Sequence, residues 1–372
     1  MKIAIEARPI KWSYGTGIGN YTSCLIQKLS EIDPVNDYTF LWPNQQPAPF
    51  IPFTRGYRYY SLPKDDNREE TEIPFWLTTE NAAVFHLPQN GFRIPRIKTC
   101  KLVVTIHDLI PYVLPEMVRS SFLKRFIQEM PLITSQADRI VTVSEASKKD
   151  ILKIFKIDPG KITVIPSAPA EIYQPLPKLE TQKKLAEDYG IKTPFILYAG
   201  GLNPRKNIAE LIYAYSKIYR ELTSRQKLLI LGPEGRHRDG LQLLVKSLNL
   251  DDNVLFPGFI KSEDMPLFYN GADLFVYPSL YEGFGLPPIE AMACGTPVIA
   301  SNVSSLPEVV GGAALLVNPY DTLALAEAML DLLHNPSRRE SMVQKGLKRS
   351  KIYSWDQIAR QMLKLYHEVA EA

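Results

Sequence analysis

Residues 274–300 read LFVYPSLYEGFGLPPIEAMACGTPVIA, and this stretch decides the fold class. It opens on one short apolar run, Leu274–Tyr277, and closes on another, Pro297–Ala300. Between them, a glycine-rich turn leads into Pro287 and Pro288. These prolines suit the first turn of a helix, because proline lacks the N–H that this turn leaves unpaired anyway. Two apolar strands joined through a helix predict a parallel β-α-β unit, since parallel strands need such a crossover.

The same alternation of strand-like and helix-like segments continues throughout the chain. In the second half, the other strand-like runs are Phe195–Ala199, Lys227–Leu231 and Asn253–Phe256. This pattern predicts an α/β protein with two Rossmann-like, doubly wound parallel-sheet domains that face a central cleft. In the first half, the expected helices are Gly19–Leu29, Glu116–Thr134 and Ser144–Phe155, and the expected strands are Ile3–Glu6, Tyr38–Trp42, Ala83–His86, Leu102–Ile106, Arg139–Val143 and Ile162–Ile165.

The length of 372 residues suits two domains of ordinary size. Periodicity is lost and proline accumulates after Ser167, so we expect a first domain over residues 1–172 and a second over residues 173–354. A final helix over residues 355–372 is expected to pack back on the first domain. The stretch 43–80 is rich in proline and charge and has no helical stripe. We expect it to be a long loop, either functional or simply solvated.

Composition excludes several classes of function. The net charge is +3, from 43 Lys and Arg against 40 Asp and Glu, whereas proteins that coat nucleic acids are strongly basic. Cys24, Cys100 and Cys294 lie far apart, so we expect neither a disulfide framework nor a zinc site. No apolar run approaches a membrane span, and the first residues indicate a strand rather than a secretion signal. We therefore expect a cytoplasmic protein, and a small phosphate-bearing ligand is compatible with this composition.

The loop after Leu274–Tyr277 carries the densest set of candidate ligand-binding groups. In open parallel sheets, ligands bind outside the carboxyl ends of the strands. Glu282 and Glu290 flank the glycine-rich turn, and carboxylates accept hydrogen bonds from hydroxyl groups. Backbone amides over Phe284–Leu286 can face a phosphate at the helix start. A glycosidase acid and base are the alternative, which we disfavour because a phosphate-type helix start has no use in glycoside hydrolysis.

Strand ends in the first half also carry candidates. Residues 15–21, GTGIGNY, open a helix, and glycines such as Gly17 let backbone N–H groups approach an anion; a plain tight turn is the alternative. His107 and Asp108 follow one strand, and His86 ends the preceding strand. A histidine there can bond a ligand hydroxyl while Asp108 orients nearby groups, although each histidine alone is more often structural. Two histidines at successive strand ends favour a polar ligand nearby.

The loop after Phe195–Ala199 reads GGLNPRKN over residues 200–207 and places two cations before a helix. The helix dipole disfavours cations at that end, and an anionic ligand would resolve the conflict. A diphosphate suits this position, because the helix N–H groups and the Lys206 ammonium would converge on its oxygens, with Arg205 beside them. Two solvated surface cations are the alternative.

Together, these motifs resemble those of the family 4 retaining glycosyltransferases, which have the two-domain GT-B fold and use a nucleotide-sugar donor. The strongest resemblance lies in Glu282-x7-Glu290 with its Gly-Phe-Gly-Leu turn, and in Ala-x-Gly-Thr-Pro-Val at residues 293–298. Supporting matches cover nearly the whole chain. They comprise the N-terminal glycine loop and the segments Thr105–Asp108, Val141–Ser144, Pro204–Asn207 and Pro257–Phe259.

The resemblance implies roles for individual residues. Glu282 would bond hydroxyls of the donor sugar and Glu290 the ribose, while Lys206, with Arg205, would bind the donor phosphates. His107 would lie beside the transferred sugar near its O6, next to Asp108. The remaining implied contacts are Gly283, Phe284, Gly285 and Leu286 for the sugar and diphosphate, Gly17 for the diphosphate, and Phe259 and Ile260 for the base, partly through backbone groups.

Two departures from the family pattern and one absence bear on the chemistry. Gly201 stands where many members have an arginine, so one phosphate cation is missing unless Arg205 replaces it. Ser167–Ala170 stands where many members read Asn-Gly-Val-Asp. The chain has no Asp-x-Asp, so we expect no metal and no cofactor, with protein cations stabilising the leaving diphosphate. The resemblance implies retention, by same-face attack in which the leaving phosphate takes the acceptor proton.

The predicted activity is transfer of a hexose from a nucleotide sugar to a saccharide or lipid-linked saccharide, in polysaccharide or glycoconjugate biosynthesis. UDP-glucose is slightly favoured because uridine donors are common in the family. GDP-mannose comes next because the 200–207 loop resembles mannosyltransferase members. An epimerase of nucleotide sugars and a non-catalytic sugar-binding module are the alternatives. The helices after His107 are basic, which suits either peripheral contact with an anionic inner-membrane surface or a solvated face; the cations are Lys124, Arg125, Lys148, Lys149, Lys153 and Lys156.

Overall fold

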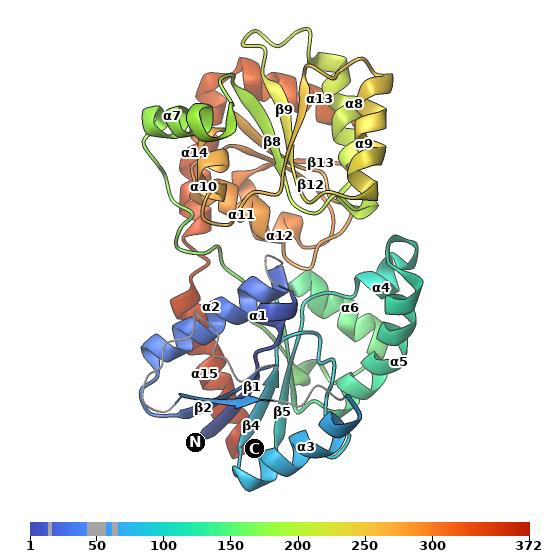
Figure 1. The fold of residues 1–372 in the computed structure, drawn as a ribbon, viewed down its shortest axis with the longest axis vertical. Coiled ribbons are helices and arrows are strands. Elements are labelled where there is room, and N and C mark those ends of the chain that lie inside the picture. Colours follow the sequence, from blue (N-terminus) through green and yellow to red (C-terminus); the bar gives the residue numbers. More distant parts are fainter. Residues whose placement is uncertain (14–16, 43–56, 62–65) are drawn as a thin grey trace. The chain divides into compact units, whose positions relative to one another are not determined.

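A computed structural model of the chain describes residues 1–13, 17–42, 57–61 and 66–372. Parts of two expected features lie outside these described residues: Gly15 and Thr16 of the N-terminal glycine loop, and residues 43–56 and 62–65 of the proline-rich stretch. The chain divides into two compact units, which Figure 1 shows. Each unit is described by itself below.

Unit 1 comprises Met1–Ser167 together with Ser354–Ala372, and unit 2 comprises Ala168–Tyr353. The chain therefore leaves unit 1 once and returns to it for its last helix. The sequence analysis expects these changes at residues 172 and 354. The first change instead falls at Ser167, where the sequence loses its periodicity.

The described strands of unit 1 form one parallel sheet in the order β3-β2-β1-β4-β5-β6-β7. The order of strands reverses between β1 and β4. At such a switch point the following loops turn to opposite faces of the sheet, which leaves room for a ligand. The strands are β1 Lys2–Glu6, β2 Asp37–Trp42, β3 Tyr57–Ser61, β4 Val84–Leu87, β5 Lys101–Ile106, β6 Arg139–Thr142 and β7 Ile162–Val164.

Unit 2 repeats this architecture with a parallel sheet in the order β10-β9-β8-β11-β12-β13. Its switch point lies between β8 and β11. The expected α/β class with two Rossmann-like, doubly wound parallel sheets is confirmed. The strands are β8 Phe195–Ala199, β9 Lys227–Leu231, β10 Val254–Gly258, β11 Leu274–Tyr277, β12 Val298–Ser301 and β13 Leu315–Val317.

Helices cover both faces of each sheet (Figure 1). In unit 1 they are α1 Pro9–Trp12, α2 Gly17–Ile32, α3 Asp66–Thr79, α4 Ile110–Val113, α5 Ser120–Gln136, α6 Glu145–Phe155 and α15 Trp355–Glu371, with 3-10 turns at Pro115–Met117 and Pro159–Lys161. In unit 2 they are α7 Lys178–Tyr189, α8 Ile208–Ile218, α9 Arg236–Ser247, α10 Met265–Gly271, α11 Leu286–Ala293, α12 Leu306–Val310, α13 Thr322–His334 and α14 Pro336–Ser350, with 3-10 turns at Pro204–Lys206 and Gly311–Ala313.

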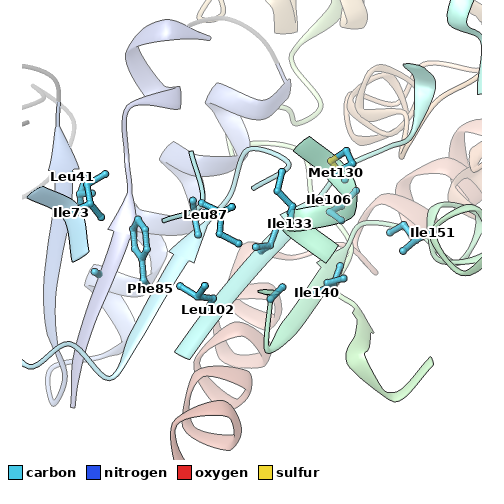
Figure 2. Close-up of a cluster of buried hydrophobic side chains, with 14 of the residues drawn as sticks. Leu41, Ile73, Phe85, Leu87, Leu102, Ile106, Met130, Ile133, Ile140 and Ile151 are labelled. Atoms are coloured by element: carbon cyan, nitrogen blue, oxygen red, sulfur yellow. The ribbon is translucent and has the colours of Figure 1, made fainter. Parts of the chain in front are cut away.

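The core of unit 1 explains why its central strands are apolar without alternation. Strand β4 is buried along its whole length, and Phe85 and Leu87 lie in a cluster with Leu102 and Ile106 of β5 (Figure 2). A strand covered by helices on both faces has no solvent side, so its sequence is a continuous apolar run. The burial of these strands leaves only the loops at their ends free to carry ligand-binding groups.

The stretch 43–80 and the start of α5 correct the sequence analysis. The stretch 43–80 is not only a loop, because it contains β3, which pairs with β2, and α3, which buries Trp76 and Leu77 in the core. Pro74 inside α3 hides the helical pattern in the sequence. The helix expected from residue 116 begins only at Ser120, since Arg119 has an extended backbone.

Helix α15 belongs to unit 1 and packs against α2, β4 and β5 (Figure 1). Its Tyr366 hydroxyl lies 2.7 Å from Nδ1 of His86, whose Nε2 lies 2.8 Å from the Thr105 hydroxyl. Burial, and next the charge of His107, lower the pKa of His86 to about 3. His86 is therefore a neutral structural histidine, which is the alternative that the sequence analysis keeps open for it.

A buried ion pair closes the end of β1. Glu6 and Arg8 are 0% and 1% exposed, and Arg8 Nε lies 2.8 Å and 2.9 Å from the two carboxylate oxygens of Glu6. The Arg8 backbone N–H also donates to Glu6, and the guanidinium lies 4.8 Å from the ring centroid of Trp12. Removing one partner of such a pair leaves an uncompensated buried charge.

We expect Arg8→Ala to lower the free energy of unfolding of unit 1 by about 3–5 kcal/mol, because the buried Glu6 carboxylate loses its counter-charge. Tryptophan fluorescence in urea measures this unit selectively, because Trp12, Trp42, Trp76 and Trp355, all 4 tryptophans of the chain, belong to it. The double variant Glu6→Gln with Arg8→Met removes both charges and should recover most of the loss. Equal losses in the single and double variants would contradict the buried-charge explanation.

Candidate active site

The switch point of unit 2 brings together the two strongest motifs of the sequence. The loop after β8 carries Arg205 and Lys206, and the loop after β11 carries Glu282. Strands β8 and β11 are neighbours in the sheet although β9 and β10 separate them in the chain. The sheet order therefore places the cations and the carboxylate side by side.

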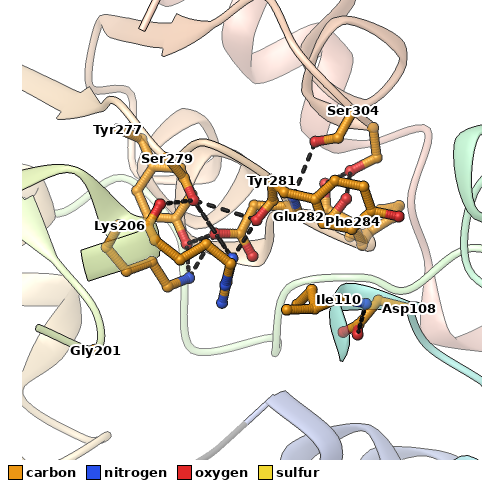
Figure 3. A network of polar contacts seen from close by, with 12 residues as sticks. Asp108, Ile110, Gly201, Lys206, Tyr277, Ser279, Tyr281, Glu282, Phe284 and Ser304 are labelled. Atoms are coloured by element: carbon orange, nitrogen blue, oxygen red, sulfur yellow. Dashed lines mark hydrogen bonds and ion pairs between the residues drawn. The ribbon is translucent and has the colours of Figure 1, made fainter. Parts of the chain in front are cut away.

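One carboxylate oxygen of Glu282 is the centre of this site (Figure 3). Its Oε1 lies 2.6 Å from Lys206 Nζ and 2.8 Å from Arg205 NH1. The hydroxyls of Ser279 and Tyr277 donate to the same oxygen at 2.6 Å and 3.1 Å. Within the described part of the chain, Oε2 of Glu282 has no hydrogen-bond partner, so this oxygen can accept from a ligand.

These contacts fix the charge states of the site. Burial by itself raises the pKa of Glu282, but the charges of Lys206 and Arg205, with hydrogen bonds from Lys206 and Ser279, outweigh it and lower the pKa to about 2. Glu282 is therefore ionised at neutral pH. The alternative of two solvated surface cations does not hold for Lys206, which is 9% exposed. In this structure Glu282 supplies the anion that the cation pair requires.

The glycine turn that follows Glu282 presents free backbone donors. Ser305 Oγ donates to the carbonyls of Glu282 and Phe284 at 2.9 Å and 2.8 Å, which fixes the turn from one side. Gly285 has φ +100, and a Cβ there would lie 2.6 Å from the Leu306 side chain, so only glycine fits. Within the described residues, no hydrogen bond is found for the N–H groups of residues 284–286. The backbone N–H groups of Phe284, Gly285 and Leu286 therefore lie at the start of α11 without a partner among the described residues, an arrangement that suits an anion.

Glu290 lies on α11 in a different environment. It is in the second turn of this helix, because α11 begins at Leu286. Tyr269 of α10 donates a 2.9 Å hydrogen bond to Glu290 Oε2. Burial raises the pKa of Glu290 to about 7, and this hydrogen bond lowers it by less. The two carboxylates of the Glu-x7-Glu motif therefore differ in charge state near neutral pH.

His107 is the principal candidate of unit 1. Its Nε2 lies 2.7 Å from the Pro88 carbonyl, which can only accept, so Nε2 carries the proton and Nδ1 is an acceptor. Burial lowers the pKa of His107 to about 4, and the bond to Pro88 raises it by less, so the ring is neutral. The backbone N–H of His107 donates to Asn90 Oδ1 at 2.8 Å. The ring of Tyr21 packs edge-on against the imidazole, with 4.9 Å between the two ring centroids. A neutral, oriented acceptor of this kind can bind a sugar hydroxyl.

The other predicted residues of unit 1 are placed as follows. Gly17 begins α2, and a Cβ on it would meet no atom of the described residues within 4 Å. Gly19 is required for packing instead, because a Cβ would lie 2.2 Å from the Ser13 carbonyl oxygen. Asp108 accepts a hydrogen bond from the Ile110 N–H at 3.1 Å and so begins helix α4. This contact gives Asp108 a structural task besides any role with a ligand.

Sequence reasoning missed several residues that hold these candidates in place. Tyr277, the last residue of β11, and Ser279 complete the donors around Glu282, and Asn90 and Tyr21 orient His107. The only signal for them is a polar group at a strand end. At the expected base site the ring of Phe259 is 63% exposed, whereas Ile260 is buried.

Comparisons with known proteins identify the family of the chain. The family model for Glycosyl transferases group 1 matches residues 181–349, and the model for Glycosyltransferase Family 4 matches residues 37–168. O-antigen chain mannosyltransferase B of Escherichia coli is 30% identical over 98% of this chain and 99% of its own. The chain belongs to glycosyltransferase family 4. The resemblance that its motifs indicated is therefore confirmed.

One further relative and one solved structure are similar to this glycosyltransferase. O-antigen chain mannosyltransferase RfbU of Salmonella typhimurium is 32% identical over 63% of this chain and 61% of its own. Sucrose-phosphate synthase from Thermosynechococcus elongatus superposes with a TM-score of 0.81 at 22% identity, covering 99% of each chain. The glycosyltransferase therefore has the GT-B fold.

Two properties of the described residues concern metals and membranes. Among them, no group of three or more His, Cys, Asp or Glu side chains is placed to hold a metal ion. Nor is any helix in the described part of this glycosyltransferase long and apolar enough to cross a membrane.

We expect Lys206→Ala to weaken nucleoside diphosphate binding about tenfold to hundredfold, the range of one charge-assisted hydrogen bond. Binding of the nucleoside alone should change little. The variant should fold, because Glu282 keeps Arg205, Ser279 and Tyr277 as partners. Calorimetry with GDP, UDP and their nucleosides measures both effects.

Lys217→Ala, at an exposed position of α8, removes the same charge as a control. Equal losses for nucleoside and nucleoside diphosphate would remove Lys206 from the phosphate site.

We expect nucleoside affinity to rise between pH 6 and 8, because ribose hydroxyls would donate to the ionised form of Glu290, whose pKa is about 7. Binding below pH 7 should release a proton, which calorimetry in buffers of different ionisation enthalpy detects. Tyr269 and Cys294, which face Glu290, do not titrate in this range because burial raises the pKa of each well above it. Glu290→Gln should bind independently of pH. Persistent pH dependence in that variant would assign the proton to another group.

Proposed function

We propose that this glycosyltransferase transfers mannose from GDP-mannose to a saccharide or a lipid-linked saccharide, with retention and without a metal ion. The observation that carries the proposal is the Glu282 carboxylate joined to Lys206 and Arg205 at the switch point of unit 2. Such a site offers cations to a diphosphate and a free carboxylate oxygen to a sugar in one place.

The choice of donor sugar rests on the relatives. Sequence patterns alone slightly favour UDP-glucose, because uridine donors are frequent in the family. The two relatives described above are O-antigen mannosyltransferases, and one of them aligns over nearly the whole chain. The names of these two relatives, together with the mannosyltransferase-like loop at 200–207, outweigh the frequency of uridine donors in the family. GDP-mannose is therefore the first choice of donor.

The proposed chemistry depends on charge growing on the leaving diphosphate. Lys206, Arg205 and the free N–H groups of the turn at 284–286 would stabilise this charge, and such preorganised donors are usually the largest contribution to catalysis. Glu282 would hold the two cations through Oε1 and accept a sugar hydroxyl through Oε2. His107 would accept from the O6 hydroxyl through Nδ1. The acceptor hydroxyl attacks from the same face, and the departing phosphate oxygen takes its proton.

Membrane contact belongs to the same proposal. Lys124 and Arg125 lie on exposed positions of α5, and Arg125 pairs with Glu129 at 2.6 Å. A lipid-linked acceptor would bring these cations near anionic headgroups. Cosedimentation with anionic and neutral vesicles tests this contact, and equal binding to both would contradict it.

We expect acceptor-dependent release of GDP from GDP-mannose, unchanged by excess chelator, when the purified protein is incubated with soluble and lipid-linked saccharides. UDP-glucose serves as the competing donor. Glu282→Ala should lower turnover by about two orders of magnitude or more, because both cations lose their anchor. Release of GDP that does not depend on the acceptor would favour an epimerase or a hydrolase. Loss of activity in chelator that Mg²⁺ restores would refute metal independence, and preference for UDP-glucose would refute the donor.

A further inference from the structure

An ion pair between Glu234, in the loop after β9, and Arg238, in the first turn of α9, lies beside the carboxyl end of β10 and has no part in the site described so far. Arg238 NH1 donates to Glu234 Oε1 at 2.9 Å, and Arg238 NH2 donates to the Phe256 carbonyl at 3.0 Å. The Arg238 side chain is 16% exposed, whereas that of Glu234 is 85% exposed. A largely buried guanidinium therefore anchors an accessible carboxylate to the end of β10.

A row of glycines connects this ion pair to the phosphate site. Gly200, Gly232 and Gly258 lie at the ends of the neighbouring strands β8, β9 and β10, and the Gly232 N–H donates to the Gly258 carbonyl at 3.2 Å. A Cβ on Gly232 would lie 2.7 Å from the Gly200 carbonyl oxygen. The loops therefore pack backbone against backbone, and the row runs from the β8 end, which carries Lys206, to the β10 end.

The far end of this row has the features of a base site. The guanidinium of Arg238 contacts β10 through its bond to the Phe256 carbonyl, and a Cβ on Gly258, the last residue of the strand, would lie 3.7 Å from Arg238 NH1. Phe259 follows directly, and its ring is exposed. An exposed aromatic face beside a fixed carboxylate can stack a base while the carboxylate contacts its edge.

We propose that Glu234 recognises the guanine base of the donor and that Arg238 is the residue that positions it. This inference rests on the proposed function, because it assumes that a nucleoside diphosphate occupies unit 2. Guanine presents N1–H and the exocyclic N2–H side by side, and one carboxylate accepts from both. Uracil presents a single N3–H between two carbonyl oxygens, which repel a carboxylate. Glu234 would thus favour GDP over UDP through a side chain, whereas the sequence analysis expects Phe259 and Ile260 to contact the base, partly through backbone groups.

An ordinary helix-stabilising pair between Glu234 and Arg238 is the competing explanation. A pair of this kind, with an exposed carboxylate, contributes little to stability and has no reason to distinguish one base from another. The two explanations therefore differ in base selectivity, which can be measured directly by binding.

The test measures the affinities of GDP, IDP and UDP by calorimetry for the full chain. IDP differs from GDP only by the missing N2 amine. The wild type should bind GDP most tightly. Glu234→Gln should weaken GDP binding about tenfold, the range of a charge-assisted hydrogen bond. It should also bring the ratio of the GDP and IDP affinities close to one. UDP affinity should stay within about twofold, since uracil gains nothing from the carboxylate. Arg238→Met should reduce the same ratio, because the carboxylate loses its anchor.

Asp239→Asn is the matched control, because it removes the same charge from the exposed first turn of α9 and should preserve the ratio. Thermal melting shows that each variant is folded. If the wild type binds GDP but Glu234→Gln leaves the ratio of the GDP and IDP affinities unchanged, this inference is overturned and the proposed function stands. A wild type that prefers UDP would overturn the inference and the donor. A wild type that binds no nucleoside diphosphate would overturn the proposed function and this inference with it.

Discussion

The reversal of strand order in each sheet is the constraint on which the functional features depend. Because β8 and β11 are neighbours whose following loops turn to opposite faces, Lys206 and Glu282 meet although β9, β10 and their helices separate them in the chain. In unit 1 the reversal between β1 and β4 has the same effect, since the Gly17 end of α2 and the Pro88 carbonyl that orients His107 follow these two strands. Each unit thus concentrates its polar groups where the apolar strands end.

Buried charge is handled differently in the two units. The pair of Glu6 and Arg8 is closed, because both carboxylate oxygens are engaged by one guanidinium and neither residue is accessible. At Glu282 all the donors converge on Oε1 and leave Oε2 open. A closed pair of this kind contributes to the fold, whereas the open arrangement holds two cations at one carboxylate oxygen and leaves the other oxygen without a hydrogen-bond partner among the described residues.

The sequence predicts much of the fold and of the candidate site, and the features that it does not predict have physical causes. The buried strands and the two glycine-rich turns are recognisable because each imposes a local pattern, and so does the cap of α6 by Ser144. Pro74 hides helix α3, because a proline interrupts the helical pattern in the sequence. Tyr277 and Ser279 could not be assigned beforehand, because their importance comes from a carboxylate on a neighbouring loop. The structural role of His86 has no local signal either, since its partner Tyr366 lies almost at the other end of the chain.

The return of the chain to unit 1 for α15 has a consequence for synthesis on the ribosome. Unit 2 is continuous, so it can fold as soon as Tyr353 has emerged. Unit 1 begins first but cannot be completed until the last helix appears, and until then His86 lacks its partner Tyr366 and Tyr21 lacks its contact with Trp355. The nascent domain that starts first is therefore the one that finishes last, and during that interval it exposes the apolar surface that α15 will cover.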